Sequence, residues 1–312
     1  MKIGLCLPQL GPFATLDAVR GFAGSAESLG FDSLWVQEHL FYPQPAEGYA
    51  GAPGVPWPEA YAQLLSPLEL LSFVAGITGH IRLGTSILVT AYHRPLALAK
   101  QVATLDVLSG GRFQLGLGLG WCEPEYQLMD TPFTARGPRS RDFIRALQCC
   151  LGPDPVEYRG VFFDIPACLT SPKPVNGSLP LIGGFWSEAG LRRTAEYCDA
   201  WMPAGMSVSE AAVGIKAING MARDDFCRAP LDLVYRVFSS PQLAGIAATA
   251  PGPLSPNWQG SVDSMRDKVE EAAAAGVSEL IIDTSFFAEN PGVAGWLAQP
   301  EFFAPLLEVV RA

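Results

Sequence analysis

The chain has 312 residues, a formal net charge of −10, 49% hydrophobic residues and 17% charged residues. This composition is typical of a globular protein with a large core and excludes a disordered chain. The acidic balance and the absence of a basic cluster argue against nucleic-acid binding, because few cations are available to neutralise phosphates. A small anionic ligand is still possible, since backbone N–H groups can bind one.

The seven cysteines form no CxxC pair and no Cys/His cluster with zinc spacing, so the sequence predicts no metal site. An odd cysteine count without a secretory signal favours a reducing cytoplasm. The N-terminus has only a short apolar run, which Pro8 interrupts, and this indicates a first strand rather than a signal peptide. No apolar run approaches the ~20 residues that span a bilayer. We therefore expect a cytoplasmic protein without a membrane segment.

Short apolar runs alternate with stretches of helical periodicity along the whole chain. Residues 2–8 predict a strand, 15–29 a helix that Gly30 ends, and 33–36 a second strand. This β-α-β unit with short connections is typical of a parallel sheet. The pattern then predicts helices over 64–78, 95–108, 139–151, 188–197, 207–221, 262–275 and 293–310, and strands over 81–89, 113–119, 180–182, 200–202, 231–238 and 279–284.

Eight predicted strands alternate with eight predicted helices. A doubly wound open sheet is the alternative, but such sheets usually have fewer strands. Most of the strands are continuous apolar runs, as expected for strands that are buried on both faces. The sequence therefore predicts an α/β fold with a single (β/α)8-barrel domain over residues 1–312.

Four stretches do not fit the repeat: 41–63, 120–138, 152–179 and 239–261. All but the third follow a strand, and loops after barrel strands gather at the carboxyl-terminal face, where active sites lie. The third follows a helix and contains an extended patch at 157–165 that could form a hairpin. Long strand-end loops predict a lid over a sizeable ligand, with ordinary loop variation as the alternative.

The chain has three histidines, and His39 lies just past the second strand, directly after Glu38. An imidazole at the barrel mouth could bind a cofactor ring, act as a base or stabilise negative charge. Glu38 could orient it or supply charge. A loop histidine that only packs or caps is the alternative. We expect His80 to be structural, whereas His93 follows the third strand and could support the site.

Two glycine-rich segments also lie at strand ends. Gly118 belongs to the GLGLG run of the fourth strand, where glycine indicates either a flat group close by or a bend. Gly183 and Gly184 join the fifth strand to a helix, and their N–H groups together with the helix N-terminus could bind an anion. Ser187 could cap that helix or donate to a phosphate.

Together these segments resemble the luciferase-like monooxygenase superfamily, in particular its deazaflavin-dependent branch. The matching stretches include GFDSLWVQEHLFYP at 30–43, the segments 81–121 and 123–139, and PLIGGFWSEAGLRRTAEYCDAWMP at 180–203. They occur in the family's order and cover most of residues 1–203. The remainder matches only in general layout.

The resemblance implies a (β/α)8 barrel that binds coenzyme F420 or FMN with its ring system deep in the mouth. The family's acid–histidine pair matches Glu38 and His39, which become the expected catalytic residues, with His39 also contacting the ring. Deazaflavin members more often carry Asp before the histidine, so Glu38 leaves FMN open as the alternative.

The family often has a non-proline cis peptide against the ring, and this maps to residues 86–89. Thr85, Ser86 and Gly118 are therefore expected cofactor contacts. The family's phosphate site maps to Gly183, Gly184 and Ser187. The resemblance also implies a small-molecule substrate and a homodimer, which is common in the family.

Some deazaflavin-dependent sugar-phosphate dehydrogenases carry a catalytic Glu directly after the strand-four glycines. Here Trp121 takes that place, and Glu123 and Glu125 follow at an offset that does not match. We therefore expect no sugar phosphate, and instead a hydrophobic metabolite in an aromatic pocket lined by Trp57, Tyr92, Trp121 and Trp186.

Three functions fit these observations. The first is an F420-dependent oxidoreductase that moves a hydride to or from an organic substrate. The second is an FMN-dependent monooxygenase that uses oxygen and takes reduced flavin from a separate reductase. The third is a barrel that binds a flavin or another ligand without turnover.

Overall fold

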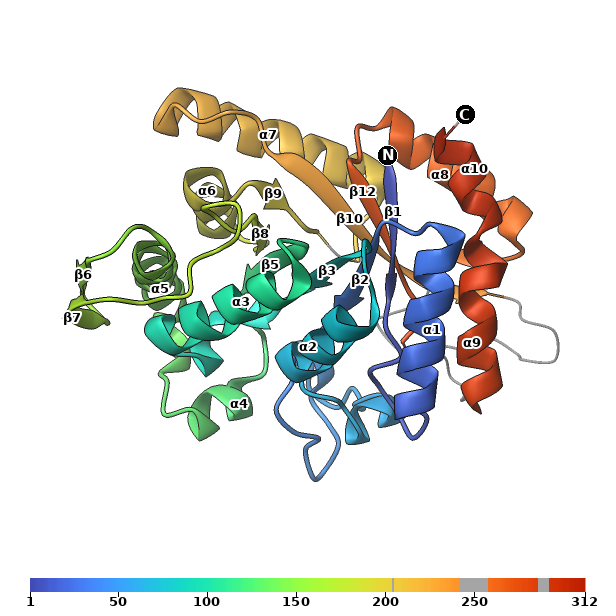
Figure 1. Ribbon diagram of the computed structural model, residues 1–312, viewed down its shortest axis with the longest axis horizontal. Coiled ribbons are helices and arrows are strands. Elements are labelled where there is room, and N and C mark those ends of the chain that lie inside the picture. The colour runs from blue at the N-terminus through green and yellow to red at the C-terminus, as the bar shows by residue number, and fades with distance from the viewer. Residues whose placement is uncertain (204, 242–257, 286–291, 312) are drawn as a thin grey trace.

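The computed structural model describes residues 1–203, 205–241, 258–285 and 292–311, and its centre is a closed parallel barrel (Figure 1). Neighbouring strands follow the order β1-β2-β3-β5-β8-β9-β10-β12, and β12 pairs with β1 again. The predicted (β/α)8 barrel is confirmed. Its strands are β1 (Lys2–Cys6), β2 (Ser33–Val36), β3 (Arg82–Thr85), β5 (Phe113–Gly118), β8 (Leu181–Gly184), β9 (Ala200–Trp201), β10 (Asp232–Pro241) and β12 (Glu279–Asp283).

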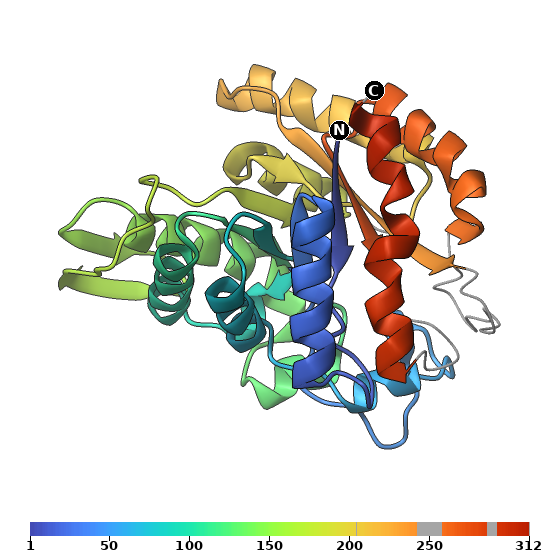
Figure 2. The same ribbon diagram turned by 45° about the vertical axis from the view of Figure 1, so that its right-hand side comes forward.

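Helices cover the outside of the barrel. Figures 1 and 2 show α1 and α9 side by side over β1, and α7 along the top of the view, against β10 and α6. None of the helices in the described ranges combines the length and apolar composition of a membrane-spanning helix. The helices are α1 (Leu16–Leu29), α2 (Pro67–Ile77), α3 (Pro95–Ser109), α4 (Glu123–Leu128), α5 (Arg136–Leu151), α6 (Glu188–Tyr197), α7 (Val208–Phe226), α8 (Val262–Ala274), α9 (Gly292–Phe303) and α10 (Pro305–Arg311).

Local sequence explains why these helices begin and end where they do. The Thr15 hydroxyl accepts a hydrogen bond from the Ala18 N–H at the start of α1, and Gly30 ends the helix in the left-handed region at φ 89°. Proline occupies the first turn of α2 and α3, where no N–H is needed. At α7, Ser207 and Glu210 form a reciprocal capping box.

The structure differs from the prediction in several connections. The third strand is interrupted by a cis Ser86–Ile87 peptide, and its second part, β4 (Leu88–Val89), pairs with β5. The last helix is two helices, because Pro305 cannot continue α9 and instead begins α10. The helix α4, within the 120–138 stretch, was not predicted.

The expected extended patch is confirmed as an antiparallel hairpin of β6 (Val156–Arg159) and β7 (Asp164–Cys168), which projects to one side of the barrel (Figure 1). Residues 242–257 of the predicted 239–261 loop lie outside the described residues. Its ends extend β10 and form β11 (Trp258–Gly260), which pairs with β10.

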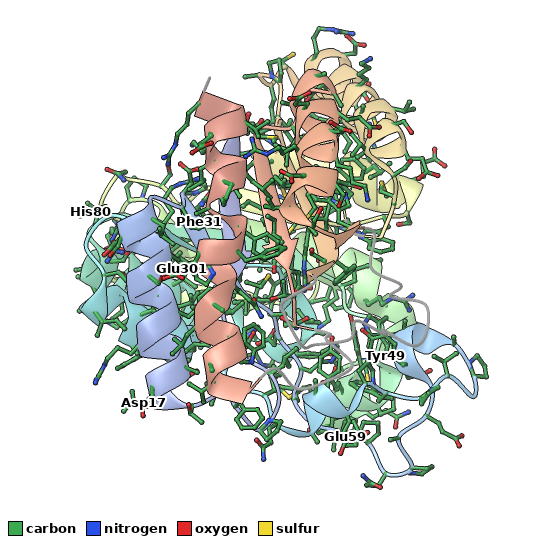
Figure 3. The ribbon with its side chains drawn as sticks, turned by 90° about the vertical axis from the view of Figure 1, so that its right-hand side faces the viewer. Asp17, Phe31, Tyr49, Glu59, His80 and Glu301 are labelled. Carbon is green, nitrogen blue, oxygen red and sulfur yellow. The ribbon has the colours of Figure 1, made fainter. Side chains whose placement is uncertain are left out.

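The 41–63 segment lies over the carboxyl-terminal end of the barrel, as predicted. It contains two short 3-10 turns, η1 (Tyr49–Gly51) and η2 (Glu59–Ala62). In Figure 3, Tyr49 and Glu59 lie at the same end of the molecule as Asp17 at the start of α1, whereas His80 lies toward the other end. The carboxyl-terminal ends of the barrel strands, from which the candidate site is built, lie at this end of the molecule.

Trp35 lies inside the barrel and is fully buried. Its Nε1 donates to the Ser33 hydroxyl at 2.7 Å, Ser33 bonds the Glu279 carboxylate, and Arg82 Nη2 donates to Glu279 Oε2 at 2.8 Å. Gly84 leaves room for the indole, since a Cβ there would lie 2.3 Å from Trp35 Cζ3. The packing of β2 against β3 therefore depends on the side chain of Trp35.

We predict that Gly84→Ala lowers the free energy of unfolding by about 1–3 kcal/mol, because the new methyl group overpacks Trp35. Urea unfolding followed by circular dichroism measures this. Gly76→Ala is the matched control: no atom lies within 4 Å of that Cβ on the exposed face of α2, and the variant should gain up to about 1 kcal/mol. Equal stability of Gly84→Ala and the wild type would contradict this packing.

Candidate functional site

His39 lies three residues beyond β2, and its ring is bound by the carboxylate of Glu125. His39 Nδ1 is 3.0 Å from Glu125 Oε2 and 3.2 Å from Oε1. Glu125 comes from the first turn of α4 and is completely buried. The Leu40 N–H donates to Oε1 at 2.5 Å, and the Tyr92 hydroxyl donates to Oε2 at 2.5 Å. Three separate strand-end segments therefore meet at one carboxylate.

These donors keep Glu125 ionised. Burial by itself raises the pKa of the Glu125 carboxyl, but the hydrogen bond and charge of His39, with the bonds from Tyr92 and Leu40, bring it below its ordinary value. Burial and the neighbouring Glu125 carboxylate raise the pKa of the Tyr92 phenol, so that its hydroxyl remains a donor.

The expectation that Glu38 orients His39 is wrong. Glu38 Oε1 lies 2.9 Å from His93 Nε2, and Oε2 accepts the Val89 N–H at 2.6 Å. Glu38 and His39 both lie beyond the end of β2, and their side chains bond to different neighbours. Glu38 thus fixes the segment that follows β3, as part of a second carboxylate–histidine pair. Its predicted catalytic role stays a prediction.

The cis peptide predicted from the family resemblance is present between Ser86 and Ile87. The Ile87 side chain fills the space beside the glycines of neighbouring strands: a Cβ on Gly118 would lie 2.5 Å from Ile87 Cδ1, and one on Gly184 would lie 2.8 Å from Ile87 Cγ2. A Cβ on Gly116 would lie 2.0 Å from the Thr85 carbonyl oxygen. Close approach of this segment accounts for these glycines without a ligand.

Thr85 and Ser86 are buried at the end of β3. The Thr85 hydroxyl donates to the Gly116 carbonyl at 3.0 Å and accepts the Gly116 N–H at 2.9 Å. The Ser86 hydroxyl donates to the Val36 carbonyl at 3.3 Å. Both side chains therefore bind neighbouring strands, and cofactor contact by them or by Gly118 stays a prediction.

A buried ion pair, which the sequence analysis did not identify, supports the same segment. Arg236 of β10 donates from Nε to Asp283 Oδ2 of β12 at 3.0 Å, from Nη1 to the Ser86 carbonyl at 2.6 Å, and from Nη2 to Gln37 Oε1 at 3.3 Å. The signal in the sequence was one Arg and one Asp within adjacent apolar strands, LVYRVF and ELIID. The guanidinium connects β10 and β12 to the cis peptide across the barrel.

Aromatic rings surround His39. The ring centroids of Trp57, Tyr61 and Trp121 lie 5.2, 5.0 and 5.2 Å from that of His39. Tyr49 joins this group at 5.1 Å from Trp121. We call Tyr49, Trp57, Tyr61 and Trp121 the aromatic cluster. Two predicted pocket residues, Trp57 and Trp121, therefore lie together beside the candidate catalytic histidine.

The other two predicted pocket residues lie elsewhere. Tyr92 packs edge-on against Tyr126 at 6.1 Å and reaches His39 only through Glu125. Trp186 is 61% exposed and lines a surface hollow between α6 and α7 with Met206 and Val213. The structure does not place Trp186 against the aromatic cluster, and its contact with substrate stays a prediction.

The turn between β8 and α6 combines a helix N-terminus with a buried cation. The Ser187 hydroxyl accepts the Gly190 N–H at 3.1 Å, so the N-cap interpretation is confirmed. Gly183 faces α6, since a Cβ there would lie 2.6 Å from Thr194 Oγ1. Arg193 is 7% exposed and its Nη2 donates to the Gly137 carbonyl at 2.9 Å. Its Nε and Nη1 have no hydrogen-bond partner among the described residues.

Among the described residues, no group of three His, Cys, Asp or Glu side chains could hold a metal ion.

Two known proteins are similar in sequence to this chain. The uncharacterized protein Rv0953c of Mycobacterium tuberculosis is 32% identical over 184 residues, which cover 57% of this chain and 64% of that protein. Pyrimidine monooxygenase RutA of Shigella flexneri is 32% identical over 199 residues, which cover 62% of this chain and 48% of RutA. The chain thus spans less than two thirds of the length of these relatives.

The solved structure of an F420-dependent secondary alcohol dehydrogenase, in complex with an F420–acetone adduct, matches with a TM-score of 0.78. The match covers 100% of this chain and 99% of that one at 17% identity, a level that shows the shared fold. The family model for luciferase-like monooxygenases matches residues 2–241. The chain belongs to the luciferase-like monooxygenase family.

Proposed function

We propose that this protein is an F420-dependent oxidoreductase that transfers a hydride between the deazaflavin and a small, uncharged, hydrophobic organic molecule. The observation that carries the proposal is the position of His39 at the barrel mouth, bound by buried Glu125 and surrounded by the aromatic cluster. The fold shared with an F420-dependent secondary alcohol dehydrogenase supports the cofactor class.

The residues at the mouth fit a flat ring system. The partly buried Ile87 supplies apolar surface at the strand-three end, and His39 supplies a polar ring nitrogen. A bound deazaflavin would supply the carbon that accepts or donates the hydride. His39 would exchange a proton between its Nε2 and an oxygen of the substrate. The charge of that oxygen changes when the hydride is transferred. The aromatic cluster limits the access of water to that nitrogen.

The turn at α6 fits the phosphate of such a cofactor. The N-terminus of a ten-residue helix offers unpaired N–H groups and a partial positive charge. Arg193 adds a guanidinium with free donors close by, lying over the Phe185 ring at 4.9 Å. A buried cation without a carboxylate partner is costly, and an anionic ligand would offset that cost.

Charge at the mouth supports an uncharged substrate. The segments that lead from the barrel strands to the next outer helix contain one Arg, Arg94, and no Lys. Arg236, the cation inside the mouth, is already paired with Asp283. A phosphorylated or carboxylated substrate would therefore meet few cations beside His39.

An FMN-dependent monooxygenase is the second candidate. The 32% identity to RutA over 199 residues favours it, as does Glu38 where deazaflavin members more often have Asp. A separate reductase would then supply the reduced flavin. The two candidates share the site but differ in cofactor and in the use of oxygen.

Titration with F420 and with FMN separates the two candidates. We expect F420 to bind with a micromolar or lower Kd, measured by the change of its fluorescence, and FMN to bind at least ten times more weakly. Micromolar FMN binding with no F420 binding would contradict the first candidate and favour the second.

The phosphate site can be tested without loss of the helix cap. Asp and Asn both cap helices, but only Asp brings a negative charge. We predict that Ser187→Asp weakens cofactor binding at least tenfold, whereas Ser187→Asn stays within about threefold of the wild type. Equal affinities of the Asp and Asn variants would remove this turn from the phosphate site. Gly184→Ala is a less specific test, because its methyl group would displace Ile87.

His39→Ala tests the catalytic assignment. Removing a preorganised polar group costs about 2–4 kcal/mol of transition-state stabilisation, so we expect kcat to fall roughly 30- to 1000-fold. Reduction of F420 by a panel of secondary alcohols, followed by absorbance, measures this, and binding titrations show whether the cofactor still binds. Normal turnover by His39→Ala would show that the assignment is wrong.

A further inference from the structure

We propose that Glu125 is the positioning residue of the site: its carboxylate fixes the His39 ring with the proton on Nδ1 and leaves Nε2 for cofactor or substrate. Its catalytic consequence rests on the proposed function, whereas the fixed tautomer rests on the geometry alone. Nδ1 lies 3.0 and 3.2 Å from the two carboxylate oxygens. An ionised carboxylate only accepts hydrogen bonds, so Nδ1 must be the donor.

The carboxylate itself is held in place. Oε1 accepts the Leu40 N–H and Oε2 accepts the Tyr92 hydroxyl, each at 2.5 Å. These donors come from the segment after β2 and from the 3-10 turn η3 (Thr90–Tyr92) after β4, while Glu125 belongs to α4 after β5. Rotation of Glu125 would break all of these bonds at once. The orientation of the imidazole is therefore set by three strand ends, of which its own loop is one.

Aromatic rings around His39 shield its hydrogen bond to Glu125 from water. The rings of Trp57, Tyr61 and Trp121 pack around the imidazole and leave its side chain 10% exposed. Nε2 makes no hydrogen bond to the described residues. In a partly dry site the bond from Nδ1–H to the carboxylate holds the ring in one orientation, so the lone pair of Nε2 is left to accept a proton or a hydrogen bond. The low pKa of the Glu125 carboxyl agrees with a permanent negative charge there.

Glu125→Gln provides a direct test, because it keeps the shape of the side chain. The Leu40 N–H can only donate, whereas the Tyr92 hydroxyl can also accept, so the amide oxygen takes the Oε1 position and the NH2 group takes the Oε2 position, which lies 3.0 Å from Nδ1. An NH2 group donates, and Nδ1 must then lose its proton to Nε2. The variant should therefore carry the other tautomer of His39.

The tautomer is read from the 15N chemical shifts of the ring nitrogens above the pH at which the ring is protonated. The chain has three histidines, so His80→Gln and His39→Gln assign the signals. We expect the wild type to be protonated on Nδ1 and Glu125→Gln on Nε2. Glu125→Asp, which keeps the charge, should restore the wild-type tautomer. Glu123→Gln, an exposed neighbour in the same helical turn, should change nothing.

Kinetics complete the test. We expect Glu125→Gln to lower kcat at least 100-fold with cofactor affinity within about threefold, and Glu125→Asp to recover part of the activity. A wild-type His39 protonated on Nε2, or an unchanged tautomer in Glu125→Gln, would overturn the positioning role, and the wild-type measurement does not depend on the folding of a Glu125 variant. A reversed tautomer with normal turnover would uphold the positioning role and contradict the catalytic function of His39 instead.

Discussion

The backbone of residues 86–89 leaves β3 and rejoins the barrel wall as β4, and side chains from around the barrel hold it there. Arg236 binds the Ser86 carbonyl, Glu38 binds the Val89 N–H, and the glycines of β5 and β8 make room for Ile87. Loss of one partner of the buried Arg236–Asp283 pair would typically cost about 3–5 kcal/mol, because the remaining charge would stay buried without compensation. The shape of the mouth depends on this segment.

Two carboxylate–histidine pairs lie beside each other at the mouth, and each contacts a different part of the site. Glu38 and His93 fix the strand-three end, whereas Glu125 and His39 place a ring nitrogen among aromatic side chains. Both carboxylates are buried and both receive backbone N–H donors, so each is bound in one orientation. The consecutive residues Glu38 and His39 therefore belong to different pairs.

Much of the fold could be predicted from the sequence, because apolar runs and helical periodicity are local patterns that repeat along the barrel. The break before Pro305 was not predicted: one helix was expected over 293–310, and Pro300 lies inside α9 without ending it. The partner of His39 was not predicted either, because Glu125 lies 86 residues away in the sequence and becomes a neighbour only in the folded barrel. Similarly, Gly118 predicts close approach of some group, but only the path of residues 86–89 shows that this group is Ile87. Local spacing thus located the strand ends, whereas contacts between strand ends required the structure.

In the proposed function the reaction takes place between the strand-three end and His39, in a mouth that the aromatic cluster covers. The most direct test is a crystal structure of the protein with F420 bound. We expect one face of the ring system against Ile87, His39 Nε2 within hydrogen-bond distance of the ring or of a bound substrate, and the phosphate at the N-terminus of α6. A ring bound away from residues 86–89, or His39 turned from it with Nδ1 released from Glu125, would contradict the proposed function.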